Sequence, residues 1–147
     1  MLTAAVVLTL GSIASLFDYM RVVPIFDSDQ TSTLSTRIDD GERSWFFAHH
    51  AQYADATTRD HPSEAMPAFA GASHFLLDTR LMMAWAKAYA EKGDTERARH
   101  LAQRLREFHN PVSEDFFAEC DEAPAKVAPL PFQCTPPSQP LGFRAFE

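Results

Sequence analysis

Residues 43–54 read R-S-W-F-F-A-H-H-A-Q-Y-A, and they form the densest group of aromatic and histidine residues in the chain. An acidic, turn-rich segment precedes this stretch and a proline-broken segment follows it. Phe46, His49 and Tyr53 recur at spacings of three and four residues, which is typical of one face of a helix. The pattern predicts a helix through residues 43–57, and the side chains expected to form its buried packing centre are Trp45, Phe46 and Tyr53.

The length and charge of the chain limit what it can be. Its 147 residues leave room for one domain plus an anchor, and 46% hydrophobic residues are enough for a core despite 10 Pro. The net charge of −7 argues against a nucleic-acid partner, because no basic surface is available to neutralise phosphates. The same charge argues against a polybasic hold on anionic lipids.

Residues 1–17, M-L-T-A-A-V-V-L-T-L-G-S-I-A-S-L-F, contain no charged side chain. A transmembrane helix needs about 17–25 apolar residues, so this run reaches the short limit. A signal-like segment would begin with basic residues, yet the first one is Arg21. A core helix of a soluble domain would show a polar face. We favour a transmembrane helix with an interfacial extension over residues 1–23, with the signal-like segment and the core helix as alternatives. The missing basic flank suggests that Met1 lies inside a longer protein.

The segment that follows the apolar run predicts the side of the membrane on which the domain lies. From Asp18 to Asp40 there are five Asp and only two Arg. Scarcity of Lys and Arg is typical of loops outside the cytoplasm. We therefore expect the rest of the chain to lie outside the cytoplasm.

Residues 24–120 are predicted to form a small helical domain, so the fold class is all-α. The clearest periodicity runs over residues 73–108, and it predicts two helices joined at Lys92-Gly93-Asp94. Gly93 is suited to cap the first helix and Asp94 to begin the second. The hairpin has tetratricopeptide character, which depends on the order of Trp85, Ala86, Tyr89, Gly93, Ala98 and Pro111. Residues 66–71 are predicted to be an apolar loop.

Residues 121–147 are predicted to be a Pro-rich extended tail, strapped across the domain by Phe132, Phe143 and Phe146. A short capped helix over residues 113–120 is expected before it. The spacing of Cys120 and Cys134 fits neither a zinc site nor a C-x-x-C redox motif. We expect these cysteines to form a disulfide, which requires an oxidising compartment. Two free thiols in the tail are the alternative.

The sequence predicts no catalytic, metal or cofactor site. His49 and His50 are adjacent, so on a helix they point about 100° apart and cannot bind one metal ion together. The chain contains no G-x-S-x-G motif for a nucleophile and no glycine-rich phosphate loop. The aromatic residues fit a core more simply than a platform for sugar rings.

The order of these features resembles a known family. The apolar run continues into S-L-F-D-Y-M-R-V, and then come D-G-E-R-S-W-F-F-A-H-H-A-Q-Y-A, L-M-M-A-W-A-K-A-Y-A-E-K-G-D and R-A-R-H-L-A-Q-R-L-R-E-F. This resembles the C-terminal region of bacterial O-antigen ligase/polymerase-like (Wzy-related) membrane proteins, and in particular PglL-type protein O-oligosaccharyltransferases. The resemblance covers about Ser15 to Cys134.

The resemblance implies the C-terminal periplasmic fragment of an inner-membrane enzyme that transfers lipid-linked glycan to protein or lipid A core. The family's catalytic residues lie in its multi-helix membrane portion, which this chain lacks, so the fragment alone is not expected to catalyse transfer. Its implied partners are the remainder of that polytopic enzyme, the lipid bilayer and a pilin-like or other acceptor protein. The alternative is an independent single-pass membrane protein with a tetratricopeptide-like interaction domain.

Overall fold

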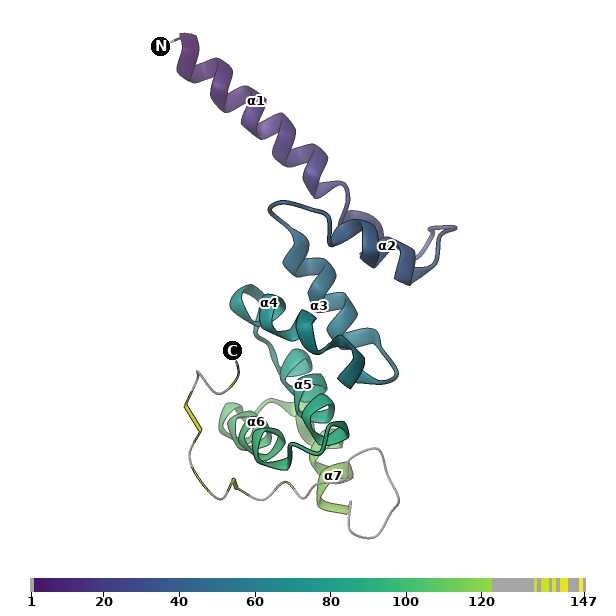
Figure 1. Cartoon of the computed structure of the whole chain (residues 1–147), viewed down its shortest axis with the longest axis vertical. Coiled ribbons are helices and arrows are strands. Elements are labelled where there is room, and N and C mark those ends of the chain that lie inside the picture. The colour runs from purple at the N-terminus through teal and green to yellow at the C-terminus, as the bar shows by residue number, and fades with distance from the viewer. Residues whose placement is uncertain are drawn as a thin grey trace.

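Helix α1 (Leu2–Tyr19) projects from one end of the molecule and meets the rest only at its C-terminal end, which we call its foot (Figure 1). The computed structural model describes residues 2–122 and positions 134, 136, 137, 139, 141, 142 and 146. Side chains such as Leu8 and Phe17 are about seven-tenths exposed. The run Thr3–Phe26 is long and apolar enough to cross a membrane, judged by length and composition.

The described residues form α-helices and short 3-10 helices without a strand, which confirms the all-α prediction. After α1 the chain forms a 3-10 helix, η1 (Val23–Phe26), and then helix α2 (Leu34–Gly41), which Thr33 caps. Helix α3 (Ala48–Thr58) follows. These elements share a small hydrophobic cluster, which we call the upper cluster, formed by Val22, Ile25, Ile38, Ala51 and Ala54.

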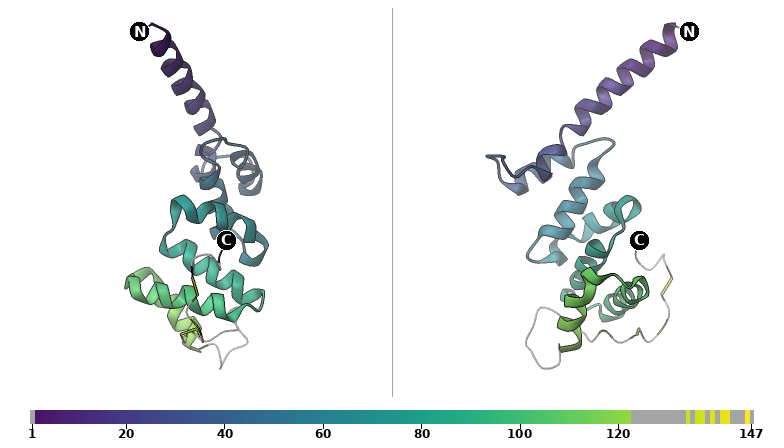
Figure 2. Two further views of the ribbon diagram at one scale, coloured as in Figure 1. Left: turned by 60° about the vertical axis from the view of Figure 1, so that its left-hand side comes forward. Right: turned by 180° about the vertical axis from the view of Figure 1, so that it is seen from behind.

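The main core lies farther from α1 and joins α3 to the remaining helices (Figure 2). These are η2 (Pro62–Ala65), α4 (Met66–Leu76), α5 (Thr79–Glu91), α6 (Thr95–Phe108), η3 (Pro111–Ser113) and α7 (Glu114–Glu122). Phe69 of α4 stacks on Trp85 of α5, with ring centroids 5.7 Å apart and an interplanar angle of 3°. Alanines fill much of the remaining space, which brings the helices close together.

Helices α5 and α6 form the predicted hairpin, and the turn between them has the predicted caps. Gly93 adopts a positive φ of 79°. Its N–H donates to the carbonyl of Ala90, and the N–H of Asp94 donates to the carbonyl of Tyr89, which together make a Schellman motif. The Asp94 side chain then accepts the N–H of Arg97 and caps α6. The tetratricopeptide character of this hairpin stays a prediction.

The predicted helix over residues 43–57 is wrong at its start, because α3 begins only at Ala48. Trp45 is 88% exposed and Phe46 62% exposed, so neither belongs to a buried packing centre. The physical reason is that the N–H groups of both residues bind the side chain of Asp18, which holds them in a bend outside the helix. Tyr53 is half-buried and packs against the main core, whose aromatic centre is Phe69 and Trp85.

The prediction of an apolar loop over residues 66–71 is also wrong, because these residues begin α4. Pro67 occupies the first turn of this helix, where its missing N–H removes no hydrogen bond. The chain then breaks between α4 and α5, where Asp78 caps α5 by accepting the N–H of Leu81 at 2.8 Å.

Cys120 and Cys134 lie at disulfide distance, as predicted, with their Cα atoms 5.6 Å apart. Both are buried in the main core. Phe146 also packs on this core, with its ring centroid 5.6 Å from that of Trp85 and 5.9 Å from that of Tyr89. The predicted contributions of Phe132 and Phe143 lie outside the described residues.

Gly41 is the tightest point of the upper cluster, and we expect Gly41→Ala to destabilise the fold by about 1–3 kcal/mol. An added Cβ would lie 2.7 Å from Ile25 Cδ1 and 3.0 Å from Ala51 Cβ. The end of the Ile25 side chain can turn aside, but the Cβ of Ala51 is fixed to the backbone of α3, so α2 and α3 would have to shift slightly apart. Chemical unfolding of the full chain in detergent, followed by circular dichroism, measures the effect. Gly142→Ala is the matched control, because nothing lies within 4 Å of its added Cβ. Equal stabilities of the two variants would contradict this packing.

Candidate functional site

The carboxylate of Asp18, at the foot of α1, holds the loop between α2 and α3. Its Oδ2 accepts hydrogen bonds from Ser44 Oγ at 2.7 Å and from the N–H of Phe46 at 2.9 Å. Its Oδ1 accepts the N–H of Trp45 at 3.0 Å. Three bonds from a segment 26–28 residues away thus converge on one side chain. We call this set of contacts the Asp18 clamp.

Ser44 completes the clamp from the loop side. Its side chain is buried, and its Oγ also accepts the N–H of Phe47 at 2.8 Å. A guanidinium N–H of Arg21 donates to the carbonyl of Arg43 at 3.4 Å. The loop is therefore tied to α1 through its backbone, which leaves the indole of Trp45 and the ring of Phe46 pointing to the outside.

A chain of aromatic and imidazole rings runs from the foot of α1 to the end of α4. The ring centroids of Tyr19 and Phe47 lie 5.3 Å apart in an edge-to-face arrangement. Phe47 stacks on His50 with the ring centroids 6.5 Å apart. The ring centroid of His49 lies 4.4 Å from that of His50 and 4.6 Å from that of Phe75. Desolvation, followed by the proximity of His49, lowers the pKa of His50 below its usual range. A neutral His50 fits a ring-packing role.

The two adjacent histidines do not gather further ligands. Within residues 2–122 and the described tail positions, no group of three His, Cys, Asp or Glu is arranged to hold a metal ion. Beside the rings lies a shallow hollow of about 320 Å³, whose described lining is Phe26, His50, Tyr53, Phe75, Leu76, Leu77 and Asp78. This lining is mostly apolar, so the hollow suits an apolar or aromatic group.

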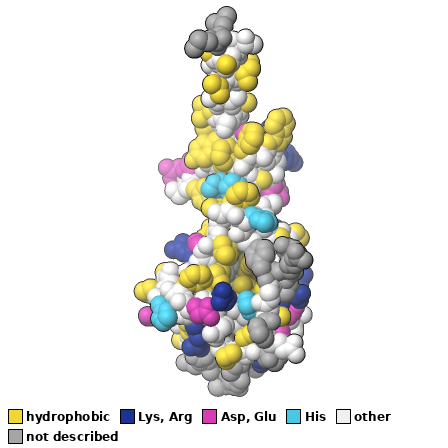
Figure 3. Space-filling model, turned by 90° about the vertical axis from the view of Figure 1, so that its left-hand side faces the viewer, with side chains coloured by type: hydrophobic (Ala, Val, Ile, Leu, Met, Phe, Trp, Pro, Cys, Tyr) yellow, Lys and Arg dark blue, Asp and Glu magenta, His cyan; other side chains and the backbone are white. Residues whose placement is uncertain are grey.

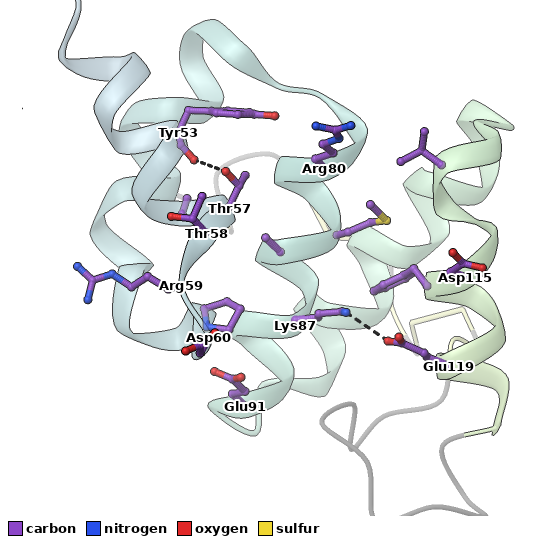
Figure 4. A pocket seen from close by; sticks show the side chains of 16 residues that line it. Tyr53, Thr57, Thr58, Arg59, Asp60, Arg80, Lys87, Glu91, Asp115 and Glu119 are labelled. Atoms are coloured by element: carbon purple, nitrogen blue, oxygen red, sulfur yellow. Dashed lines mark hydrogen bonds and ion pairs between the residues drawn. The ribbon is translucent and has the colours of Figure 1, made fainter. Parts of the chain in front are cut away.

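A larger cleft opens between α3, α5 and α7, with a volume of about 640 Å³ (Figure 4). Its cations and carboxylates come from α5, from α7 and from the residues that follow α3, and it is lined by Arg59, Asp60, Arg80, Lys87, Glu91, Asp115 and Glu119, among others. Lys87 pairs with Glu119 at 3.2 Å, which joins α5 to α7. Arg59 pairs with Asp55 at 2.7 Å within the chain segment that ends α3.

Arg80 is the exposed cation of this cleft whose side chain forms no ion pair within 4.0 Å among the described residues. Figure 4 shows it at the end of the cleft near Tyr53. The described lining contains Thr57 and Thr58 but no serine, cysteine or histidine. The described lining carries three cations and four carboxylates, so the cleft suits a segment of mixed charge, and its described side chains do not supply a nucleophile–histidine pair.

Tyr53 separates the large cleft from the apolar hollow, since it lines both. Its hydroxyl donates to Asp78 Oδ2 at 2.7 Å, while Asp78 Oδ1 caps α5. The structure therefore does not bring the three predicted packing residues together. Trp45 and Phe46 lie at the foot of α1, whereas Tyr53 connects α3 to the start of α5.

Sequence reasoning missed Asp18 and Arg80 as site residues. A single carboxylate directly after an uncharged run of 17 residues was the available signal for Asp18. No local pattern pointed to Arg80, because the cleft arises only when α3, α5 and α7 pack together.

Comparison with known proteins adds no relative: no family model, no curated protein and no solved structure matches this chain.

Removing the hydroxyl of Tyr53 tests the join between α3 and α5. Burial, followed by the hydrogen bond to Asp78 and its charge, raises the pKa of Tyr53 to about 12. Because the folded chain holds this proton more tightly, the stabilisation is complete below pH 10 and is lost as pH rises towards 12. We expect Tyr53→Phe to cost about 0.5–1.5 kcal/mol at pH 8 and to lose less stability than wild type between pH 10 and 12.

Urea unfolding at pH 8, 10 and 12 measures both effects. Tyr89, whose pKa burial also raises, stays in both proteins and accounts for the residual pH dependence. Tyr19→Phe serves as the control, since Tyr19 lies outside the main core. Parallel pH profiles for Tyr53→Phe and wild type would contradict the assigned contact.

Proposed function

We propose that this chain is the membrane-anchored, extracytoplasmic C-terminal region of a glycan ligase or protein O-oligosaccharyltransferase. The observation that carries the proposal is the pairing of an exposed apolar helix with a small helical domain clamped to its foot. This is the architecture expected of a last membrane helix followed by the domain that it leads into. The resemblance of residues 15–134 supplies the enzyme class.

The cysteine pair supports a location outside the cytoplasm. Cys120 and Cys134 are both buried and at disulfide distance, and such bonds persist in oxidising compartments such as the bacterial periplasm. In the chain-entropy model, closing a loop of this size stabilises the folded state by about 3 kcal/mol.

A thiol count on unreduced protein from the cell should therefore find no free thiol.

The role of the domain in this proposal is to hold a partner of the reaction rather than to perform the chemistry. The cleft between α3, α5 and α7 offers both charges and hydroxyls, and Arg80 faces it with an exposed guanidinium. Such a surface suits a polar segment of an acceptor protein that carries a carboxylate to pair with Arg80. The transfer step itself belongs to the multi-helix membrane portion that the resemblance implies.

The second candidate is an independent single-pass protein whose α5–α6 hairpin binds another protein. The α5–α6 hairpin favours this function, because stacked helical hairpins form the binding surfaces of repeat proteins. It differs from the first proposal in one measurable respect. Loss of the domain would leave the glycans of the cell unchanged.

Deleting the coding region for residues 27–147 tests the proposal in the cells that make the protein. We expect the glycan carried by acceptor protein or by lipid A core to fall at least tenfold, as followed by glycan staining and mass spectrometry. Arg80→Glu should lower transfer to protein acceptor partially, whereas Arg104→Glu on the exposed face of α6 should not. Unchanged glycans after the deletion would contradict the proposal and support the interaction protein.

A further inference from the structure

The foot of α1 carries a patch of exposed aromatic and apolar side chains. Trp45 and Phe46 are exposed on the clamped loop. Helix α1, the turn after it and η1 contribute the rest of the patch, which is Phe17, Tyr19, Met20 and Phe26. Hydrophobic side chains gather over this end of the body in the space-filling view (Figure 3). Exposed apolar patches of this kind mark surfaces that meet a partner or a membrane. We call it the foot patch.

We propose that the foot patch is a membrane-docking surface, and that Trp45 and Phe46 insert into the interfacial layer of the bilayer beside α1. The inference rests on the part of the proposed function in which α1 spans the membrane. It adds a second point of membrane contact, 27 and 28 residues along the chain from Asp18 of α1. Two membrane contacts, α1 and the foot patch, would then fix the orientation of the domain relative to the membrane.

The depth of the loop follows from the Asp18 clamp. Residues 1–17 carry no charged side chain, and Asp18 near the end of α1 is the first charged residue. Charged side chains are costly in the hydrocarbon core of a bilayer, so the end of α1 lies near the boundary of that core. The N–H of Trp45 lies 3.0 Å from Asp18 Oδ1, so Trp45 shares that depth. Trp and Tyr are enriched at this boundary, where a ring meets both apolar chains and water.

The backbone N–H groups of the loop need no water to complete their hydrogen bonds. Five consecutive N–H groups, from Arg43 to Phe47, all donate hydrogen bonds inside the protein. Arg43 and Ser44 donate to the carbonyls of Asp40 and Gly41, Trp45 and Phe46 donate to Asp18, and Phe47 donates to Ser44. Unsatisfied backbone donors are costly in lipid, and these five are satisfied without water.

The charges around the patch favour an uncharged interface over an anionic one. Exposed Arg21 and Arg43 lie beside the aromatic side chains, but Asp39, Asp40 and Glu42 lie next to them in α2 and the turn after it. Together with Asp18, four carboxylates outnumber the two cations, so the patch has no net basic field with which to bind anionic lipid. We therefore expect aromatic burial to drive the docking, and zwitterionic lipid to suffice.

Fluorescence of Trp45 in vesicles tests the proposal. The full chain with Trp85→Phe is reconstituted in phosphatidylcholine vesicles whose acyl chains carry bromine at shallow or deep positions. We expect strong quenching of Trp45 by shallow bromine, weaker quenching by deep bromine, and protection from iodide in water. Because Trp85 is buried and stacks on Phe69 in the main core, the circular dichroism spectrum of the Trp85→Phe chain is compared with that of the unsubstituted chain to check that the variant folds.

Two further variants separate docking on lipid from burial of the foot patch against a protein. Phe46→Ser should at least halve the shallow quenching of Trp45, whereas Phe75→Ser, which removes a similarly exposed ring on α4, should not change it. Quenching of Trp45 by iodide and not by bromine would overturn the proposal. Protection from both quenchers would also overturn it, because a protein would then cover the patch. Glycan transfer plays no part in these readouts, so the two proposals fail separately.

Discussion

The carboxylate of Asp18 is the contact through which α1 and the rest of the protein become one body. Helix α1 is almost entirely exposed, so side-chain packing alone would let it pivot at its foot. Three hydrogen bonds to Ser44, Trp45 and Phe46 instead join it to the loop that begins α3. Because a carboxylate accepts these bonds more strongly than a neutral group would, the join depends on one charged side chain. The upper cluster, which contains Val22 and Ile25, begins four residues after Asp18 in the chain.

The two hydrophobic clusters connect the Asp18 clamp to the cleft through α3. Helix α3 belongs to both, since Ala51 and Ala54 face the upper cluster and Ala56 the main core. Tyr53 and Asp78 then connect α3 to the first turn of α5, which carries Arg80. The cleft between α3, α5 and α7 therefore has a defined position relative to α1. In the proposed function this presents a bound segment at a set distance from the membrane.

Features that depend on neighbouring residues could be predicted from the sequence. The apolar run, the Gly93–Asp94 turn and the pairing of Cys120 with Cys134 follow from composition, spacing and backbone preference. Trp45 and Phe46 could not be placed, because helical spacing says nothing about a carboxylate that binds their N–H groups from 27 and 28 residues away. The start of α4 was missed because a proline at position 67 indicates a helix break, although proline is also favoured in a first turn. The cleft could not be predicted from the sequence, because it forms only when three helices that are distant in sequence pack together.

The central claim is that Asp18 holds α1 and the helical body in one arrangement. The most direct test is the distribution of distances between spin labels at position 12 of α1 and position 60 beyond α3, measured by pulsed electron paramagnetic resonance in nanodiscs. We expect one narrow distribution for the wild-type background and for Asp29→Ala, and a broad distribution for Asp18→Ala. An equally narrow distribution in Asp18→Ala would contradict the claim.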